Sequence, residues 1–140
     1  MRDEIKKLLP HREPFLFVDE IIAADEKRII TRHVFTEDEF FFQGHFPGYP
    51  VVPGLILVET MAQSGGAGLR KLGILDGDAL FFLASVDKVK FRRQVRPGDE
   101  LRCEIENLRV SRSMIRQSGK AYAGDELAAE AEWMCLVSRR

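Results

Sequence analysis

One histidine and one glutamate in the middle of the chain could together transfer protons. His45 lies in the loop GHFPGYPVVPG, and Glu59 is the only acid of the apolar segment that follows this loop. Histidine titrates near neutral pH, whereas burial in an apolar helix raises the pKa of a carboxyl, so a base and an acid can coexist at pH 7. Taken singly, either residue could be structural, with His45 ordering a turn and Glu59 pairing with a cation.

The start of the expected helix supplies a third chemical group. Pro53 and Gly54 end the loop, and no proline occurs from Leu55 to Gly73, so we expect a helix that begins at about Gly54. Its first N–H groups lack intrahelical acceptors and lie at the positive end of the helix dipole, which suits an oxygen that gains negative charge. A base, an acid and such a donor can remove the proton next to a carbonyl and expel a group one carbon further on.

The helix that carries Glu59 has no polar face before Arg70, so other parts of the chain must cover it. The cluster from Ser64 to Gly68 has almost no side-chain volume, which allows strands, a second helix or a ligand to approach the helix backbone closely. A membrane span is the alternative interpretation, but the buried acid, Gln63 and the glycine cluster argue against it.

Strand patterns separated by turn residues occupy most of the remaining chain. The predicted strands are 15–24, 28–35, 80–93, 99–110, 113–123 and 126–137. A short helix capped by Asp3 and stopped by Pro10 precedes them. We expect one α+β domain over residues 1–140, in which a curved antiparallel sheet wraps one long central helix. A dimer would cover the sheet edges and the open end of the helix.

Composition excludes several classes of protein. With 140 residues, 31% charged side chains and a formal net charge of -1, the chain suits one globular domain without nucleic-acid-binding character. Charges interrupt the N-terminal MRDEIKKLLP, so no export signal is visible and we expect the cytoplasm. Cys103 and Cys135 have no CxxC spacing, so we expect buried thiols and no metal site. We interpret His11 and His33 as structural, because neither has a candidate proton partner nearby.

The chain resembles the FabZ-type 3-hydroxyacyl-acyl-carrier-protein dehydratases in four segments: LPHREPFLFVDE, GHFPGYPVVPGLILVETMAQ, FLASVDKVKFRRQVRPGDEL and AEAEWMCLV. These segments cover nearly the whole chain in the order of the family. The resemblance implies the hot-dog fold, a cofactor-free lyase, and an acyl carrier protein as partner. It also implies homodimers that share their active sites and usually assemble as homohexamers, which are trimers of dimers.

The same resemblance implies a role for each candidate residue. His45 would draw the C2 proton of the 3-hydroxyacyl thioester, the Gly54 N–H would hold the thioester oxygen, and Glu59 of the partner subunit would help the hydroxyl leave as water. Gln63, one helical turn beyond Glu59, could orient that acid. The related FabA type, which also isomerises the double bond, has Asp as the acid, so Glu favours a plain dehydratase. Departures from the family pattern, which put the substrate range in doubt, are Glu13, Val52 and Thr60.

Two larger groups of residues could contact the rest of the substrate. A row of cations suits an acidic carrier protein by steering encounter, although it could equally be a solvated strand face. Its members are Lys88, Lys90, Arg92, Arg93 and Arg96, with Val89 and Phe91 expected on the opposite, core-facing side of the strand. An acyl tunnel lined by aromatic and apolar residues is the second expectation, although each residue could be core. The tunnel candidates are Phe46, Tyr49, Leu55, Phe81, Phe82, Leu83 and Phe91.

Two other functions fit the same residue pattern. A hot-dog thioesterase would hydrolyse the same class of thioester and release a free acid. A non-catalytic acyl-binding module of the same fold would bind the ligand and form neither product. The presence of both His45 and Glu59 favours elimination over these alternatives.

Overall fold

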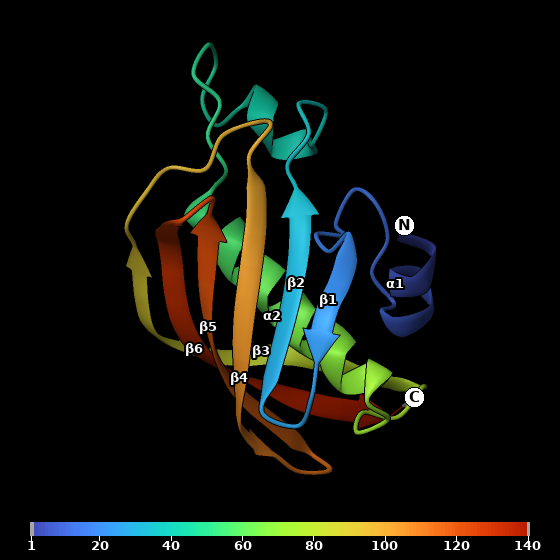
Figure 1. Ribbon diagram of the computed structural model, residues 1–140. Helices are drawn as coiled ribbons and strands as arrows, with labels where there is room; N and C mark the ends of the chain where they lie inside the picture. The colour runs from blue at the N-terminus through green and yellow to red at the C-terminus, as the bar shows by residue number, and fades with distance from the viewer. Residues whose placement is uncertain (1, 140) are drawn as a thin grey trace.

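The protein forms a six-stranded antiparallel sheet that curves around one long helix (Figure 1). The computed structural model describes residues 2–139. The helices are α1 (Arg2–Leu8), the short 3-10 helix η1 (Phe40–Gln43) and α2 (Gly54–Lys71). The strands are β1 (Glu20–Ala24), β2 (Arg28–Val34), β3 (Ala79–Phe91), β4 (Glu100–Val110), β5 (Met114–Ala123) and β6 (Glu126–Arg139).

Helix α2 is the centre of the fold. The strands pair in the order β1-β2-β4-β5-β6-β3, and α2 contacts all of them. From Leu57 to Leu69 every residue of α2 except Glu59 is buried. The predicted architecture is therefore confirmed, and the helix begins at Gly54 as expected. Within residues 2–139, no helix is both long and apolar enough to cross a membrane.

Three glycines allow the strands to approach the backbone of α2. A Cβ atom added at Gly65 would collide with Gln117 of β5, one at Gly66 with Phe81 of β3, and one at Gly68 with Ile29 of β2. Each strand side chain occupies the space that a helix side chain would otherwise take. The close approach predicted from the glycine cluster is therefore confirmed for three separate strands.

The first predicted strand is too long. We expected a strand over 15–24, but β1 covers only Glu20–Ala24. The backbone at Phe15 and Phe17 bonds to a side chain of α2 instead of a neighbouring strand. The Phe17 N–H donates to Gln63 Oε1 at 2.8 Å, and Gln63 Nε2 donates to the Phe15 carbonyl at 3.1 Å. An apolar sequence pattern cannot reveal that a helix side chain replaces the sheet partner.

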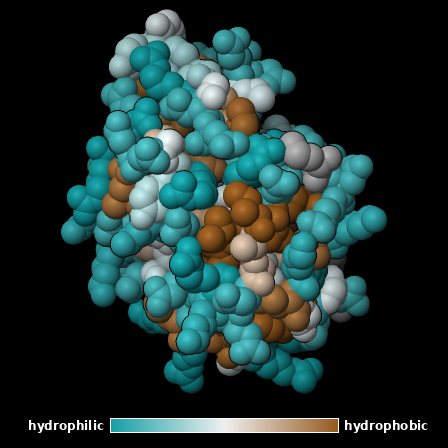
Figure 2. Space-filling view, in the orientation of Figure 1, coloured by the Kyte–Doolittle hydropathy of each residue, from teal (hydrophilic) through white to brown (hydrophobic). Residues whose placement is uncertain are grey.

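Strand β3 is an edge of the sheet and leaves large apolar side chains exposed. Phe82 is 55% exposed and Phe91, which we expected in the core, is 51% exposed. Leu55, at the start of α2, is 76% exposed. Apolar residues also gather in one area of the face shown in Figure 2, where hydrophilic residues surround them. An exposed apolar edge strand is typical of a surface that another chain covers.

The regular alternation predicted for Lys88 to Arg92 is wrong. The pairing of β3 with β6 shifts register between Asp87 and Lys90, so one extra residue is inserted on β3. Lys88 has a φ of 52°, in the left-handed region that non-glycine residues rarely adopt. Such a bulge turns neighbouring side chains away from a strict two-sided pattern.

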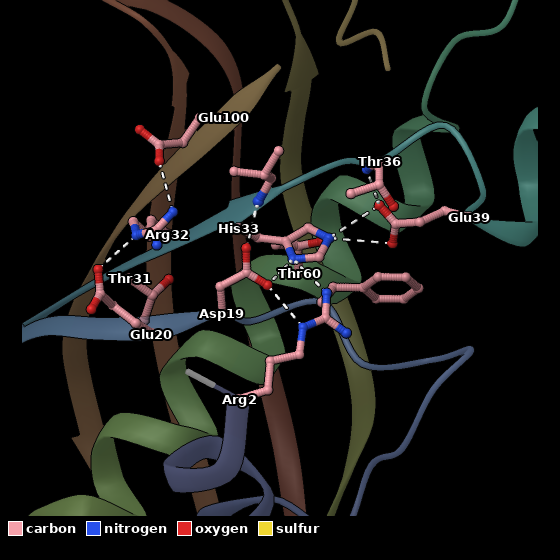
Figure 3. A network of polar contacts seen from close by, with 12 residues as sticks. Arg2, Asp19, Glu20, Thr31, Arg32, His33, Thr36, Glu39, Thr60 and Glu100 are labelled. Atoms are coloured by element: carbon pink, nitrogen blue, oxygen red, sulfur yellow. Dashed lines mark hydrogen bonds and ion pairs between the residues drawn. The ribbon is translucent and has the colours of Figure 1, made fainter. Parts of the chain in front are cut away.

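A buried ion-pair network joins α1, the segment before β1, and β2 (Figure 3). His33 Nδ1 lies 3.0 Å from Asp19 Oδ1, and Arg2 Nε donates to the same carboxyl at 2.9 Å. His33 Nε2 lies 3.3 Å from the carboxylate of Glu39. The expectation that His33 lacks a proton partner is therefore wrong, because residues distant in sequence supply two of them. The network connects elements around the sheet edge, which agrees with a structural role.

The His33 and Asp19 charges stabilise each other. Burial alone would lower the pKa of His33, but the hydrogen bonds and charges of Asp19 and Glu39 raise it. Burial alone would raise the pKa of Asp19, but hydrogen bonds from His33 and the Val34 N–H hold it well below its usual value. The stabilisation from Asp19 is therefore lost as pH falls through its lowered pKa, and that from His33 is lost as pH rises through its raised pKa.

Replacing Asp19 with asparagine is expected to lower the free energy of unfolding by about 3 kcal/mol at pH 5, since it removes one of the two carboxylates that pair with the buried His33 cation. The loss should shrink as pH rises through the raised pKa of His33, so it is expected to be smaller at pH 9 than at pH 5. Urea unfolding at the two pH values measures this difference. Glu20→Gln is the control, because Glu20 forms a partly exposed pair with Arg32 and such pairs contribute at most about 1 kcal/mol. A loss for Asp19→Asn as small as that of the control would contradict the prediction.

Candidate active site

His45 is held so that one ring nitrogen can accept a proton. Its Nδ1 lies 2.9 Å from the Val51 carbonyl oxygen, and the Val51 N–H donates to the His45 carbonyl at 2.7 Å. A carbonyl oxygen can only accept, so Nδ1 must carry the hydrogen and Nε2 is left unprotonated in the neutral ring. The Phe46 ring stacks on the imidazole with 4.2 Å between centroids and an interplanar angle of 24°. The loop thus orients the imidazole and leaves its Nε2 free to accept a proton.

Gly54 lies beside His45 at the first turn of α2. Both residues line a hollow of about 530 Å³. Pro53 gives the helix no side-chain cap, and its carbonyl accepts the N–H groups of Ile56 and Leu57. The Gly54 N–H has no backbone acceptor within residues 2–139, so it remains available to an oxygen in the hollow. A Cβ atom on Gly54 would lie 2.8 Å from the Phe91 ring, which leaves no space for a side chain.

Glu59 lines a second hollow, of about 260 Å³. Gln63 Nε2 donates to Glu59 Oε2 at 3.0 Å. The orientation of the Gln63 amide is fixed, because its oxygen accepts the Phe17 N–H and its nitrogen also donates to the Phe15 carbonyl. Burial raises the pKa of Glu59 more strongly than the hydrogen bond from Gln63 lowers it. The carboxyl can therefore hold a proton at a pH where an exposed glutamate is ionised.

His11 shares this second hollow, which sequence reasoning missed. We expected a structural histidine without a proton partner, but His11 Nε2 lies 3.8 Å from Glu59 Oε2. The turn that carries His11 has no periodic pattern, so the sequence gives no sign of which surface it packs on. The expectation that His11 lacks a proton partner is therefore wrong.

Five of the seven predicted tunnel residues line one of the two hollows, whereas Phe46 and Tyr49 line neither. Phe81, Phe82 and Leu83 of β3 line the hollow of Glu59, together with Cys135 of β6. Leu55 and Phe91 line the hollow of His45. Cys103 and Cys135 are free, buried thiols, as predicted. In one chain, therefore, the candidate base and the candidate acid face different spaces along the same strand and helix.

Acidic side chains lie among the predicted row of cations. Lys88 Nζ lies 3.6 Å from Glu132, and Arg92 Nε lies 3.1 Å from Glu130. Arg93 reaches Asp99 and Glu126, and Arg96 lies over the Tyr49 ring, 4.1 Å from its centroid. These acids reduce the positive charge that a carrier protein would meet. Docking of a carrier on Lys88, Lys90, Arg92, Arg93 and Arg96 stays a prediction.

Known proteins are similar to this chain over almost its full length. Residues 9–132, which include His45, Gly54 and Glu59, match the FabA-like domain family. The 3-hydroxyacyl-[acyl-carrier-protein] dehydratase FabZ of Desulforamulus reducens is 45% identical over 137 residues, covering 97% of this chain and 96% of the relative. The chain belongs to the FabZ-type dehydratase family. The FabZ of Clostridioides difficile is 44% identical to this FabZ-type chain over 133 residues, covering 94% of it and 93% of the relative.

Solved structures agree with the fold of this FabZ-type chain. The dehydratase heterocomplex ApeI:P from Xenorhabdus doucetiae superposes with a TM-score of 0.83 at 16% identity, covering 97% of this chain and 91% of the other. A hypothetical thioesterase with coenzyme A from Streptococcus pneumoniae has a TM-score of 0.64 at 13% identity, covering 86% of each chain. At such low identity these neighbours establish the fold alone. The predicted hot-dog fold and the predicted family are both confirmed.

Proposed function

We propose that this chain removes water from 3-hydroxyacyl-[acyl-carrier-protein] to form the 2-enoyl product, with His45 as base and Glu59 as acid. The names of its relatives supply the substrate class and the reaction. The observation that carries the residue roles is the presence of a His45 ring whose Nε2 is left free to accept a proton and of a partly buried Glu59 carboxyl whose pKa is raised. These are the protonation states that elimination of water requires at its start.

The reaction breaks two bonds and forms one double bond. His45 Nε2 takes the proton from C2, and the Gly54 N–H stabilises the negative charge that develops on the thioester oxygen. The electrons left at C2 form the double bond to C3 as the bond from C3 to its hydroxyl breaks. Glu59 gives its proton to the departing hydroxyl, which leaves as water. Since Oε2 accepts a hydrogen bond from Gln63, Oε1 is the oxygen that carries this proton.

A second copy of the chain would bring the two halves of the site together. The hollow of Glu59 lies at the Phe81–Leu83 end of β3, and the hollow of His45 lies at its Phe91 end. Two β3 edges paired antiparallel about a two-fold axis near Val86 would set opposite ends side by side. Each site would then combine His45 and Gly54 of one chain with Glu59 of the partner subunit. The exposed apolar residues of β3 support this pairing.

Assembly beyond the dimer and the contact with the carrier protein belong to the same proposal. We extend the proposal to a homohexamer, a trimer of dimers, and to a cytoplasmic location, and both rest on the resemblance to the FabZ-type family. Glu59, rather than Asp, supports a dehydratase without isomerase activity.

Product analysis tests the proposed reaction directly. Purified protein incubated with a 3-hydroxyacyl-carrier substrate is expected to give the enoyl-carrier thioester, identified by loss of water in its mass and by absorbance of the conjugated double bond. A free acid without enoyl product would instead indicate a thioesterase. Binding of the substrate with neither product would indicate an acyl-binding module.

A further inference from the structure

His11 and Glu59 form a polar pair that the proposed reaction does not yet use. The two side chains come from the turn after α1 and from the middle of α2. His11 Nε2 and Glu59 Oε2 are 3.8 Å apart, slightly beyond hydrogen-bond distance. Catalytic hydrogen bonds are often long in the free enzyme and shorten when substrate binds. A displacement of less than about 1 Å would place His11 Nε2 within bonding distance.

The turn that carries His11 is held firmly in place. The Arg12 guanidinium donates to the carbonyls of Leu9 at 2.8 Å, His11 at 2.7 Å and Lys6 at 3.0 Å. The imidazole lies against the Phe81 ring, 5.7 Å between centroids. His11 Nδ1 is buried and, within residues 2–139, has no hydrogen-bond partner. Since a buried N–H without an acceptor is costly, the hydrogen of neutral His11 belongs on Nε2, which faces Glu59.

The surroundings of this pair favour the neutral forms of both side chains, mainly through burial. Burial, and then the charge of Arg12, lower the pKa of His11, so the imidazole is uncharged at neutral pH. From β6, Cys135 faces the same hollow, and burial and the charge of Glu59 raise the pKa of its thiol to about 12. Phe81, Phe82 and Leu83 of β3 add only apolar surface, and Gln63 of α2 is an uncharged donor. No cation of the described chain is among the residues that line the hollow of Glu59.

We propose that His11 is a positioning residue for the acid: its neutral Nε2–H is a second donor, beside Gln63, to Glu59 Oε2. With two donors on Oε2, the proton of the carboxyl is confined to Oε1, the oxygen that would give it to the departing hydroxyl. The same two donors stabilise the carboxylate that forms when the proton leaves. This proposal rests on the proposed function, in which Glu59 is the acid.

Three substitutions at His11 distinguish hydrogen bonding to Glu59 from a contribution to packing alone. His11→Leu fills the space without a donor and is expected to lower kcat about 10- to 100-fold, with KM changed less than about 3-fold, because the lost bond acts mainly in the transition state. His11→Gln restores a neutral donor and should recover most of kcat. His11→Lys places a cation beside Glu59 and should move the alkaline limb of the kcat profile to lower pH by about 1–3 units.

Each outcome of these measurements bears on the proposal. Wild-type turnover in His11→Leu, or equal losses in His11→Leu and His11→Gln, would show that His11 only packs and would overturn it. An unchanged alkaline limb in His11→Lys would do the same, even if His11→Leu failed to fold. His33→Gln is the matched histidine control and should change the thermal midpoint without moving the alkaline limb. Active Glu59→Gln would instead overturn the proposed function, whereas inactive Glu59→Gln with unaffected His11 variants would overturn this inference alone.

Discussion

Substituting alanine for His45 is expected to lower kcat/KM for dehydration by a factor of about 1,000, which is within the range for loss of a general base. The effect follows from the free Nε2, since among the described residues no other side chain that could act as a general base lines the hollow of Gly54. Glu59→Gln should cause a loss of similar size, because the amide keeps the shape of the carboxyl but has no acidic proton. Turnover of a 3-hydroxyacyl-carrier substrate, followed by enoyl formation, measures both effects.

Both variants should remain folded. His45 is partly exposed, and Glu59→Gln removes a charge that burial disfavours. Circular dichroism and the thermal midpoint check this point, and Glu26→Gln, on the exposed turn between β1 and β2, is the control acid. Turnover near that of the wild type in either His45→Ala or Glu59→Gln, with the fold intact, would refute the assigned roles.

Mixing the two inactive variants is expected to restore activity. If His45 and Glu59 act across a dimer, a heterodimer of His45→Ala and Glu59→Gln has one site with both groups and one site with neither. Random exchange of subunits would then recover about one quarter of the wild-type activity, since half of the dimers are mixed and each has one intact site. Turnover should rise as the subunits exchange.

The double variant His45→Ala with Glu59→Gln is the control for this experiment. Mixed with either single variant it can form no site that holds both groups, so it should restore nothing. Mass spectrometry of differently tagged chains verifies that mixed dimers form. Inactive mixtures in which mixed dimers are abundant would mean that the two residues do not share a site across the dimer.

The sequence predicts the architecture because the patterns that indicate it, a long apolar helix and a cluster of glycines within it, lie in one continuous segment. An apolar helix without a polar face requires cover, and the glycine cluster indicates where the cover comes closest. Pro53 and Gly54 mark the start of α2 correctly. The pKa of Glu59 is also predictable in direction, since burial of its helix alone decides it.

The sequence-based predictions are wrong where contacts between residues far apart in the chain determine the local structure. Residues 15–17 belong to the predicted first strand, but the Gln63 amide takes backbone bonds that a neighbouring strand would make. The bulge after Asp87 depends on the register of β6, which no local pattern specifies. The position of His11 depends on how the turn after α1 packs on α2. Such contacts form between segments far apart in the chain, so residue type and spacing do not reveal them.

The glycines of α2 also determine the direction in which the Glu59 carboxyl points. Side chains of β5, β3 and β2 enter at Gly65, Gly66 and Gly68, so three strands fix the rotation of the helix about its own axis. Each residue of a helix adds about 100° of rotation, and Glu59 turns rigidly with the glycines that follow it. A methyl group at one of these glycines would therefore swing the carboxyl away from its target without touching a reacting atom. Loss of turnover from such a change would measure the angular setting of the helix rather than the chemistry of the altered residue.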